Sequence, residues 1–346
     1  MKALVTGGCG FIGSNFIINN ISKYDKILNV DSLTYAANIE NLSILQGNSK
    51  YSFVNEDISN TKNMIHIINQ FMPDVIIHFA AESHVDRSID SPLKFIHTNV
   101  LGTASLLQSS LDYYNRKKRD FRFIHISTDE VYGSLKSNGV FNELSPHKPN
   151  SPYSASKASS DHIVRAWYKT YDLPVIITNC SNNYGPYQFP EKLIPLMIAN
   201  CIDEKPLPIY GNGKNIRDWI YVSDHCDAIQ KIIKDGSIGE TYNIGGNNEI
   251  ENIQIVKIIC DMLDDIKPCK NFNSYSDLIR FVDDRPGHDF RYAVDSSKLK
   301  NQLKWVPIET IKTGMEKTIK WYLANQRWWR NIQKNNYNQE RLGLKK

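Results

Sequence analysis

The sequence predicts an α/β protein with a doubly wound parallel sheet and a smaller second domain of mixed α/β structure. Short apolar runs recur through the first half of the chain, and stretches of helical length separate them. Parallel strands covered by helices on both faces have such runs because neither face meets water. A cluster of glycines directly follows the first run, as in the turn that opens this type of sheet.

The apolar runs and the glycine turn together indicate a Rossmann-type fold. The stretch 91–114 is long enough for a crossover helix. After about Asn182 prolines and aromatic residues become frequent, which favours a separate lobe. We expect a first domain over 1–180 and a second over 181–346, with the chain returning to the first around 218–248. The expected strands are residues 3–5, 27–30, 51–54, 75–79, 121–127 and 175–178.

Composition excludes several classes of protein. Of the 346 residues, 41% are hydrophobic and 23% charged, which is typical of a folded chain. The net charge of +4 argues against a nucleic-acid binder. No apolar run is long enough for a membrane span or a signal peptide. We expect the basic run 116–119 to end a helix and the tail from Arg327 to pack on the protein body.

Cysteine usage predicts free thiols in a reducing compartment. The six cysteines are scattered without a Cys-x-x-Cys pair, and the nine histidines do not cluster with them. We therefore expect a cytoplasmic protein with no metal site. The cysteines are Cys9, Cys180, Cys201, Cys226, Cys260 and Cys269.

The glycine cluster predicts a dinucleotide site. Residues 7–13 fit both Gly-x-Gly-x-x-Gly and Gly-x-x-Gly-x-x-Gly, and the chain there can approach a pyrophosphate closely. The next helix directs backbone N–H groups at the same phosphates. Asp31 ends the second run, where its carboxylate can accept hydrogen bonds from a ribose and repel a 2′-phosphate. These features in register favour NAD over NADP.

Two further strand ends carry candidate cofactor contacts. Asp57 and Ile58 follow the third run, and Ala80 and Ala81 follow the fourth. Small residues let a cofactor pass close to the backbone. Ligands of open parallel sheets bind at the carboxyl ends of the strands, so these positions belong with the glycine turn.

Tyr153 and Lys157 are candidate catalytic residues. At a spacing of four they share one face of a helix, and Pro152 favours a helix start just before them. A tyrosine with a pKa of roughly 10 is a weak base at neutral pH. A nearby ammonium and a positively charged nicotinamide would lower that pKa, so that Tyr153 can take a hydroxyl proton. Thr128, at the end of the fifth run, can hydrogen-bond the same hydroxyl.

Asp129 and Glu130 stand beside this pair. Two carboxyl groups can serve as one acid and one base if their surroundings separate their pKa values. Neighbours on an ideal strand point to opposite faces, so both reach one ligand only if the chain turns there. Gly133 makes such a turn plausible.

These motifs resemble the dTDP-glucose 4,6-dehydratase family of extended short-chain dehydrogenases/reductases. The paired acids after Thr128 distinguish this family from the related epimerases. The resemblance extends from the first strand to about Asp295. It rests on the glycine turn, Asp31 with residues 33–36, and the stretches 80–88, 127–133, 153–157, 179–195, 217–219 and 284–292.

The resemblance implies a cycle in which NAD is regenerated without leaving. Tyr153 takes the proton of the glucose 4-hydroxyl while NAD takes the C4 hydride, and Lys157 orients the ribose. Glu130 removes the C5 proton, Asp129 protonates the departing 6-hydroxyl, and the hydride returns to C6. The product is dTDP-4-keto-6-deoxyglucose, and the account needs Asp129 protonated and Glu130 ionised. A rhamnose or other deoxysugar route is the expected context.

The resemblance also assigns binding roles. Arg217 and Arg285 suit a diphosphate on their own chemistry, because guanidinium binds phosphate bidentately. Expected substrate contacts are Ser83, Thr128, Asn182, Lys192, Leu193, Pro208, Ile209, Tyr210, Arg217, Asn252, Arg285, His288 and Tyr292. Expected NAD contacts are Gly7, Gly10, Phe11, Ile12, Gly13, Asp31, Ser32, Leu33, Thr34, Asp57, Ile58, Ala80, Ala81, Ser83, Thr98, Tyr153, Lys157 and Asn183.

Alternatives remain at this point. Ala37 stands where the family often has glycine. Phe290 stands where a basic residue is common, and this second departure bears on a phosphate contact and on the preference for thymidine over uridine. A UDP-glucose 4,6-dehydratase, a UDP-sugar 4-epimerase and a catalytically silent NAD-binding regulator are the competing interpretations. The family resemblance further implies a homodimer joined by a four-helix bundle formed by residues 91–114 and 153–171 of each subunit.

Overall fold

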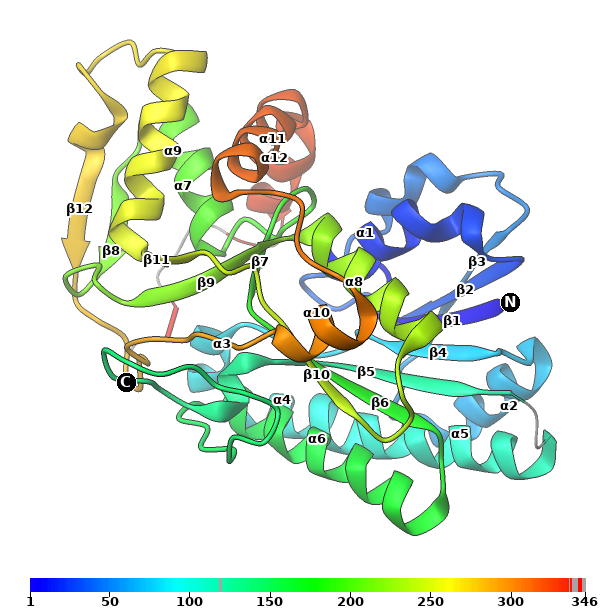
Figure 1. Ribbon diagram of the computed structural model, residues 1–346. Helices are drawn as coiled ribbons and strands as arrows, with labels where there is room; N and C mark the ends of the chain where they lie inside the picture. The colour runs from blue at the N-terminus through cyan, green and yellow to red at the C-terminus, as the bar shows by residue number, and fades with distance from the viewer. Residues whose placement is uncertain (118–119, 336, 338–341, 344–346) are drawn as a thin grey trace.

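A seven-stranded parallel sheet forms the centre of the computed structural model, which describes residues 1–117, 120–335, 337 and 342–343. The strand order is β10-β6-β5-β4-β1-β2-β3, and all six neighbouring pairs are parallel (Figure 1). The predicted Rossmann-type sheet is therefore confirmed. Its strands are β1 (Lys2–Thr6), β2 (Lys26–Asp31), β3 (Tyr51–Asn55), β4 (Val75–His78), β5 (Arg122–Thr128), β6 (Val175–Cys180) and β10 (Thr241–Ile244).

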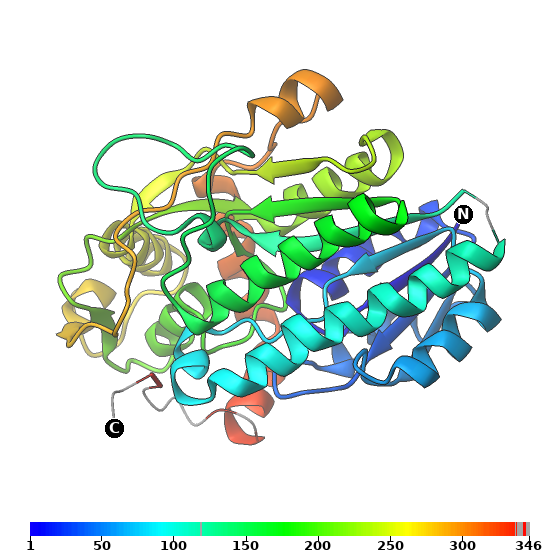
Figure 2. The same cartoon turned by 90° about the horizontal axis from the view of Figure 1, so that it is seen from below.

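Helices cover both faces of this sheet, as the apolar runs require. Alternate residues of one strand enter different cores: Leu4 packs with α2, α5 and α6, whereas Ala3 and Val5 pack with α1, α8 and α10. Figure 2, which views the molecule from below, shows α5 and α6 side by side in front of the sheet. These helices, with two short ones, are α1 (Phe11–Asn20), α2 (Thr61–Phe71), α3 (Val85–Asp90), α4 (Pro92–Phe95), α5 (Thr103–Lys117), α6 (Pro152–Tyr171), α8 (Val222–Asp235) and α10 (Ser297–Leu303).

The second lobe has mixed structure around a core of its own. In one small sheet β9 pairs in parallel with β7 and antiparallel with β11, and in another β8 and β12 are parallel. Its elements are β7 (Asn182–Tyr184), β8 (Leu207–Tyr210), β9 (Ile216–Tyr221), β11 (Glu249–Glu251), β12 (Ile279–Val282), α7 (Leu193–Ile202), α9 (Asn252–Ile266), α11 (Ile311–Ala324) and α12 (Gln326–Asn335).

The chain passes between the lobes more than once. It returns to the large sheet with α8 and β10, within the expected range 218–248. It returns again with α10, which packs on β10 and α8 and lies outside that range. The start of the tail, in α12, packs on the body as expected, because Trp329 is fully buried and Trp328 donates its indole N–H to Asn41 (2.8 Å); residues 336, 338–341 and 344–346 lie outside the described structure.

Candidate active site

The glycine turn brings the start of α1 against the sheet. Gly7 has a φ of +71°, and a β-carbon on it would lie 2.5 Å from the backbone nitrogen of Ala80. A β-carbon on Gly13 would lie 2.4 Å from the carbonyl oxygen of Gly7. Only glycine fits this cradle. No side chain caps α1, so the N–H groups of its first turn, at Phe11 and Ile12, remain available to a pyrophosphate.

Asp31 ends β2 and ties two loops together. Its carboxylate accepts the backbone N–H groups of Cys9 (2.9 Å) and Leu33 (2.8 Å). Burial raises the pKa of Asp31, and these two hydrogen bonds oppose that shift. The carboxylate oxygens keep lone pairs that suit ribose hydroxyls. Ser32 and Thr34 belong to the loop that Asp31 holds, so the residues present fit an adenosine site.

The other expected cofactor residues stand at neighbouring strand ends. Ala80 and Ala81 lie just past the end of β4, and Ile58 is buried after β3. Asn183, on β7, is held through its amide by His225 (2.9 Å) and the carbonyl of Ser181 (3.0 Å). Three further expected positions make no hydrogen bond with these residues in the described structure. The Asp57 carboxylate accepts the N–H of Ser59, Thr98 lies in the helical turn 96–102, and Ser83 is exposed.

The turn that both carboxyl groups require begins directly after β5. Thr128 is its N-cap, and its hydroxyl accepts the N–H of Glu130 (3.3 Å). A short 3-10 helix, Asp129–Tyr132, follows, and Gly133 leaves it with a φ of +87°. Asp129 and Glu130 are therefore not on an extended strand, and the geometric objection to a shared ligand is removed.

Electrostatics separates the two carboxyl groups. Burial, the Glu130 carboxylate and Asp218 raise the pKa of Asp129 well above its ordinary value. Burial also raises the pKa of Glu130, but Arg285, Arg217 and Lys192 all lower it. Asp129 is 1% exposed, and its Oδ2 has no hydrogen-bond partner among the described residues. Both pKa values are raised, that of Asp129 further, so the arrangement favours a proton on Asp129 rather than on Glu130.

Tyr153 and Lys157 lie on the first turns of α6. A capping box of Ser151 and Ser154 starts this helix, with Pro152 at its first position. Tyr153 is buried and Lys157 donates its ammonium to the carbonyl of Ile126 (2.8 Å). In the protein alone burial and the Glu130 carboxylate raise the pKa of Tyr153 well above its ordinary value, while a Thr128 hydrogen bond lowers it. The expected lowering of the Tyr153 pKa by nearby positive charge is therefore smaller than the effect of burial in the protein alone.

Three cations converge on Glu130 from the second lobe. Arg217 is buried, stacks on the Tyr292 ring (4.4 Å) and donates to the carbonyls of Ile216, Asp289 and Phe290. The backbone of Phe290 thus anchors Arg217, while its side chain is 46% exposed. Lys192 donates to the carbonyl of Ser83 (3.0 Å), and Arg285 to Asp86 (2.9 Å).

The remaining expected substrate residues surround these cations. Buried Oδ1 atoms of Asn182 and Asn252 and the Nε of Arg285 lack hydrogen-bond partners in the described part of the chain. Buried polar atoms of this kind are suited to a polar ligand. Oδ1 of Asp284 lies 2.6 Å from Nδ1 of His288, and burial lowers the pKa of His288 to about 4. Leu193 starts α7, and Pro208, Ile209 and Tyr210 lie on β8.

Comparison with known proteins agrees with this geometry. The family model described as GDP-mannose 4,6 dehydratase matches residues 4–318. A dTDP-glucose 4,6-dehydratase of Neisseria meningitidis serogroup B is 53% identical over 100% of this chain and 99% of that protein. One of Escherichia coli is 53% identical over 99% of both. The dTDP-glucose 4,6-dehydratase from Streptomyces venezuelae, solved with NAD bound, is 43% identical, with a TM-score of 0.89 over 96% of this chain and 100% of that one.

This chain belongs to the dTDP-glucose 4,6-dehydratase family. Among the residues that the structure describes, no group of His, Cys, Asp or Glu side chains is arranged to hold a metal, and no helix is long and apolar enough to cross a membrane. The described cysteines are free, and all but Cys269 are buried.

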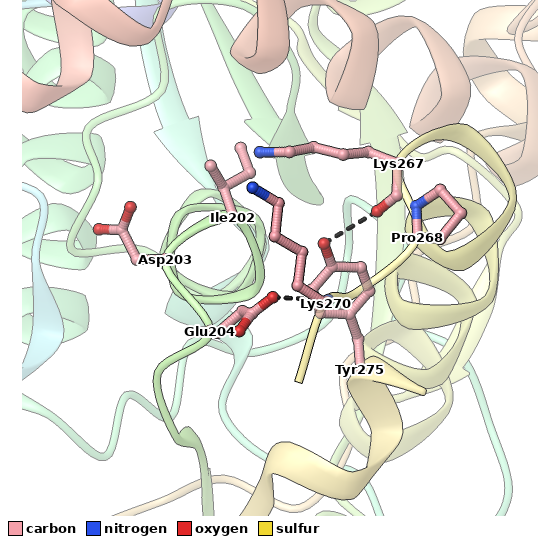
Figure 3. Close-up of a pocket in the computed structure, with 7 residues that line it drawn as sticks. All are labelled: Ile202, Asp203, Glu204, Lys267, Pro268, Lys270 and Tyr275. Atoms are coloured by element: carbon pink, nitrogen blue, oxygen red, sulfur yellow. Dashed lines mark hydrogen bonds between the residues drawn. The ribbon is translucent and has the colours of Figure 1, made fainter. Parts of the chain in front are cut away.

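A separate hollow in this dehydratase lies away from the site. Its wall comes from the end of α7 and the segment after α9, and both Lys267 and Lys270 border it (Figure 3). None of the residues expected to bind substrate or cofactor lines it. It therefore adds nothing to the dehydratase site.

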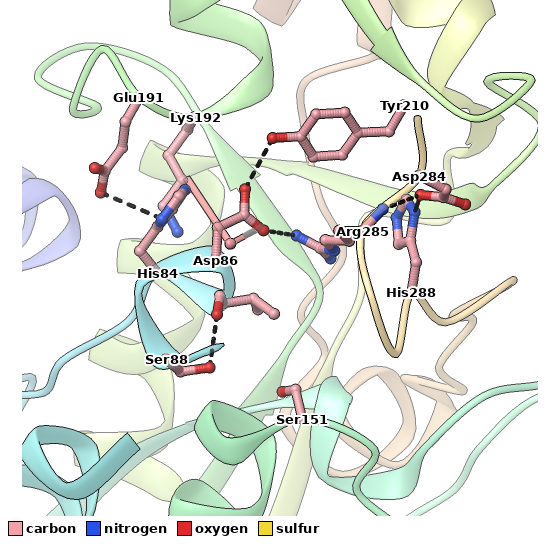
Figure 4. Close-up of polar contacts among 12 residues, drawn as sticks. His84, Asp86, Ser88, Ser151, Glu191, Lys192, Tyr210, Asp284, Arg285 and His288 are labelled. Carbon is pink, nitrogen blue, oxygen red and sulfur yellow. Dashed lines mark hydrogen bonds and ion pairs between the residues drawn. The ribbon is translucent and has the colours of Figure 1, made fainter. Parts of the chain in front are cut away.

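Several polar residues beside the candidate site were not predicted from the sequence. Buried Glu191 joins the lobes, because its carboxylate accepts from Arg87 (2.8 Å) and Tyr35 (2.9 Å) and lies 3.9 Å from His84 (Figure 4). Asp86 makes a second connection of this kind. The available signal was the titratable residues His84, Asp86 and Arg87 after the carboxyl end of β4, where an open parallel sheet binds its ligands.

Proposed function

We propose that this chain converts dTDP-glucose into dTDP-4-keto-6-deoxyglucose and water. One observation carries the proposal: Asp129 and Glu130 lie close to Tyr153 at one turn, and their surroundings raise the pKa of Asp129 further than that of Glu130, which favours Asp129 as the acid and Glu130 as the base. The elimination of water across C5 and C6 needs such an acid and base in addition to Tyr153. Epimerisation at C4 involves no elimination and does not need this second pair.

NAD fits the glycine cradle, the uncapped first turn of α1 and Asp31. When bound, NAD supplies a reversible acceptor for hydride. The residues in the cradle would hold its pyrophosphate, and Lys157 and Tyr153 would face its other end from α6. Asn183, pinned by His225, would add a fixed amide there.

The chain's own residues perform the proton transfers. Tyr153 accepts the proton of the 4-hydroxyl, which Thr128 orients, and Lys157 stabilises the resulting phenolate by its charge. Glu130 accepts the C5 proton, which the 4-ketone makes acidic. Asp129 gives its proton to the departing 6-hydroxyl, so that water leaves. Burial of Asp129 raises its pKa and so favours the form of the carboxyl group that carries this proton.

The nucleotide serves as a handle for the sugar. Arg217 and Arg285 would bind the diphosphate, since backbone carbonyls hold Arg217 and the Asp86 carboxylate holds Arg285, whose Nε has no partner among the described residues. The same cations lower the pKa of Glu130, so binding groups and catalytic base are electrostatically linked. The diphosphate would partly neutralise them.

Mass spectrometry of dTDP-glucose in heavy water, with enzyme and no added NAD, tests the proposal. We expect loss of one water and one deuterium gained at C5. Conversion to a C4 epimer of unchanged mass would overturn it in favour of an epimerase. Turnover of UDP-glucose in preference to dTDP-glucose would overturn the thymidine assignment alone.

We further propose a homodimer in the cytoplasm, with residues 91–114 and 153–171 forming a four-helix bundle. Leu93 (77% exposed), Ile96 (45%) and Leu101 (55%) support this contact, as large apolar side chains on one helical stretch. Free thiols support the compartment. Sedimentation of a Leu101→Glu variant should show monomers where the unmodified chain shows dimers. A monomeric unmodified chain would contradict the assembly.

A further inference from the structure

Asp86 connects the two lobes at the substrate side of the site. It lies on α3, just after β4 of the large sheet, and is 5% exposed. Its Oδ2 accepts the hydroxyl of Tyr210 (3.1 Å), and its Oδ1 accepts Nη1 of Arg285 (2.9 Å) (Figure 4). Both partners belong to the second lobe. One buried carboxylate of the sheet lobe therefore fixes two side chains of the other lobe.

The partners come from one edge of a single small sheet. Tyr210 is the last residue of β8, and Arg285 follows the end of β12 at Val282. Because β8 and β12 are parallel, their carboxyl ends meet at the same edge. Asp86 thus sets the position of that edge, and of Arg285 in particular, relative to the turn that carries Glu130.

Arg285 keeps donors for a ligand while Asp86 holds it. Of the Arg285 nitrogens, Nη1 donates to Asp86, and the buried Nε has no hydrogen-bond partner within the described residues. Guanidinium groups bind diphosphates through several N–H groups at once. A long side chain that is already fixed loses little further freedom on binding.

We propose that Asp86 is a positioning residue that prearranges Arg285 and Tyr210 to bind the diphosphate of the nucleotide sugar. The inference rests on the proposed function for the identity of the ligand. It concerns how the ligand is held and assigns Asp86 no part in bond breaking.

Loss of the Asp86 charge has two opposing effects. It would free the Arg285 cation for phosphate, which strengthens binding. It would also leave Arg285 beside Lys192 and Arg217, whose like charges act against it in the present arrangement. Without its anchor Arg285 would swing away from them, and an asparagine has an acceptor oxygen at only one of the two positions, with an NH2 donor facing the other partner. We therefore expect the positioning effect to win.

Titration calorimetry with dTDP on Asp86→Asn tests this directly. We expect Kd for dTDP to rise about tenfold or more, and KM for dTDP-glucose with it, while kcat changes less than about threefold. Asp90→Asn is the matched control on the same helix, because Asp90 is exposed and accepts only from Gly343 in the described structure. It should bind dTDP as the unmodified chain does.

A double-mutant cycle separates positioning from general stability. Tyr210→Phe should weaken dTDP binding on its own but have little further effect in Asp86→Asn, because the shared contact is already lost. Unchanged or tighter dTDP binding by Asp86→Asn, or fully additive losses, would overturn the inference. If the unmodified chain does not dehydrate dTDP-glucose, the proposed function fails, yet the same comparison with dTDP or UDP still decides the role of Asp86.

Discussion

Asp129 and Glu130 are adjacent in the chain, yet charges of opposite sign act on their carboxyl groups. The carboxylates of Glu130 and Asp218 act on buried Asp129 and raise its pKa further. Three cations, Arg285, Arg217 and Lys192, act on Glu130 and offset part of the rise in its pKa that burial causes. The 3-10 turn after Thr128 produces this difference, because it places consecutive residues in separate surroundings.

Glu130→Gln should stop the reaction after oxidation at C4. The amide keeps the size of the side chain but cannot accept the C5 proton, so turnover should fall by about 10²–10⁴. Deuterium exchange at C5 should disappear, while absorbance of reduced cofactor should still develop with substrate. Persisting C5 exchange in this variant would remove Glu130 from the role of base.

Asp129→Asn should lose activity. Its stability relative to the wild type should increase as the pH rises. The pKa of Asp129 is raised above its ordinary 3.8 on folding, so native Asp129 stays protonated at pH values where the unfolded chain has ionised it. The ionisation of Asp129 therefore does not change the stability of the wild type below about pH 3.8. That stability falls as pH rises toward the folded pKa, by about 1.4 kcal/mol per unit.

The asparagine variant lacks this ionisation. Its thermal midpoint should exceed that of the wild type by an amount that grows from pH 4.5 to 7. Activity should fall by about 10²–10⁴ because the acid is gone. A constant difference in midpoint across this range would show that Asp129 ionises normally in the folded protein.

Tyr153→Phe should abolish turnover while NAD stays bound. The variant removes one hydroxyl and keeps the ring, which packs edge-on against the Phe95 ring with 6.3 Å between the ring centroids. We expect kcat to fall by about 10²–10⁴, with the thermal midpoint little changed. Turnover and the cofactor content of the purified variant provide the measurements, and near-normal activity would exclude Tyr153 as the base.

The sheet was predictable because its signals are local. Each predicted strand lies in one apolar run, and Gly7 to Gly13 marks the first turn without reference to distant residues. The pairing of β8 with β12 was not predictable, since it joins segments far apart that no periodicity relates. The addition of α10 to the large sheet was missed for the same reason, and the division at residue 180 stays a prediction.

The candidate site divides along similar lines. Thr128, Tyr153 and Lys157 follow from strand ends and helix spacing, but their protonation depends on neighbours from other elements. Raised pKa values at Tyr153 and Asp129 arise mainly from burial, which a sequence does not state. Asp86 escaped notice because its partners, Tyr210 and Arg285, are distant in the chain.

Gly7→Ala should damage both stability and NAD binding. Its φ of +71° disfavours a β-carbon, and that carbon would lie 2.5 Å from the backbone nitrogen of Ala80. Backbone cannot move aside as a flexible side chain can, so the loop and the start of α1 must shift. Gly47→Ala is the matched control: Gly47 has a φ of +81°, and nothing lies within 4 Å of the place that a β-carbon would take there.

Both variants carry the cost of a left-handed alanine, about 1–2 kcal/mol, but only Gly7→Ala adds the clash. We expect urea unfolding to show Gly7→Ala at least about 2 kcal/mol less stable than Gly47→Ala. Retention of NAD on purification should be lost in the first and normal in the second. Equal stability and equal cofactor content would mean that the turn relaxes freely, and the tight cradle would then not be what selects glycine at this position.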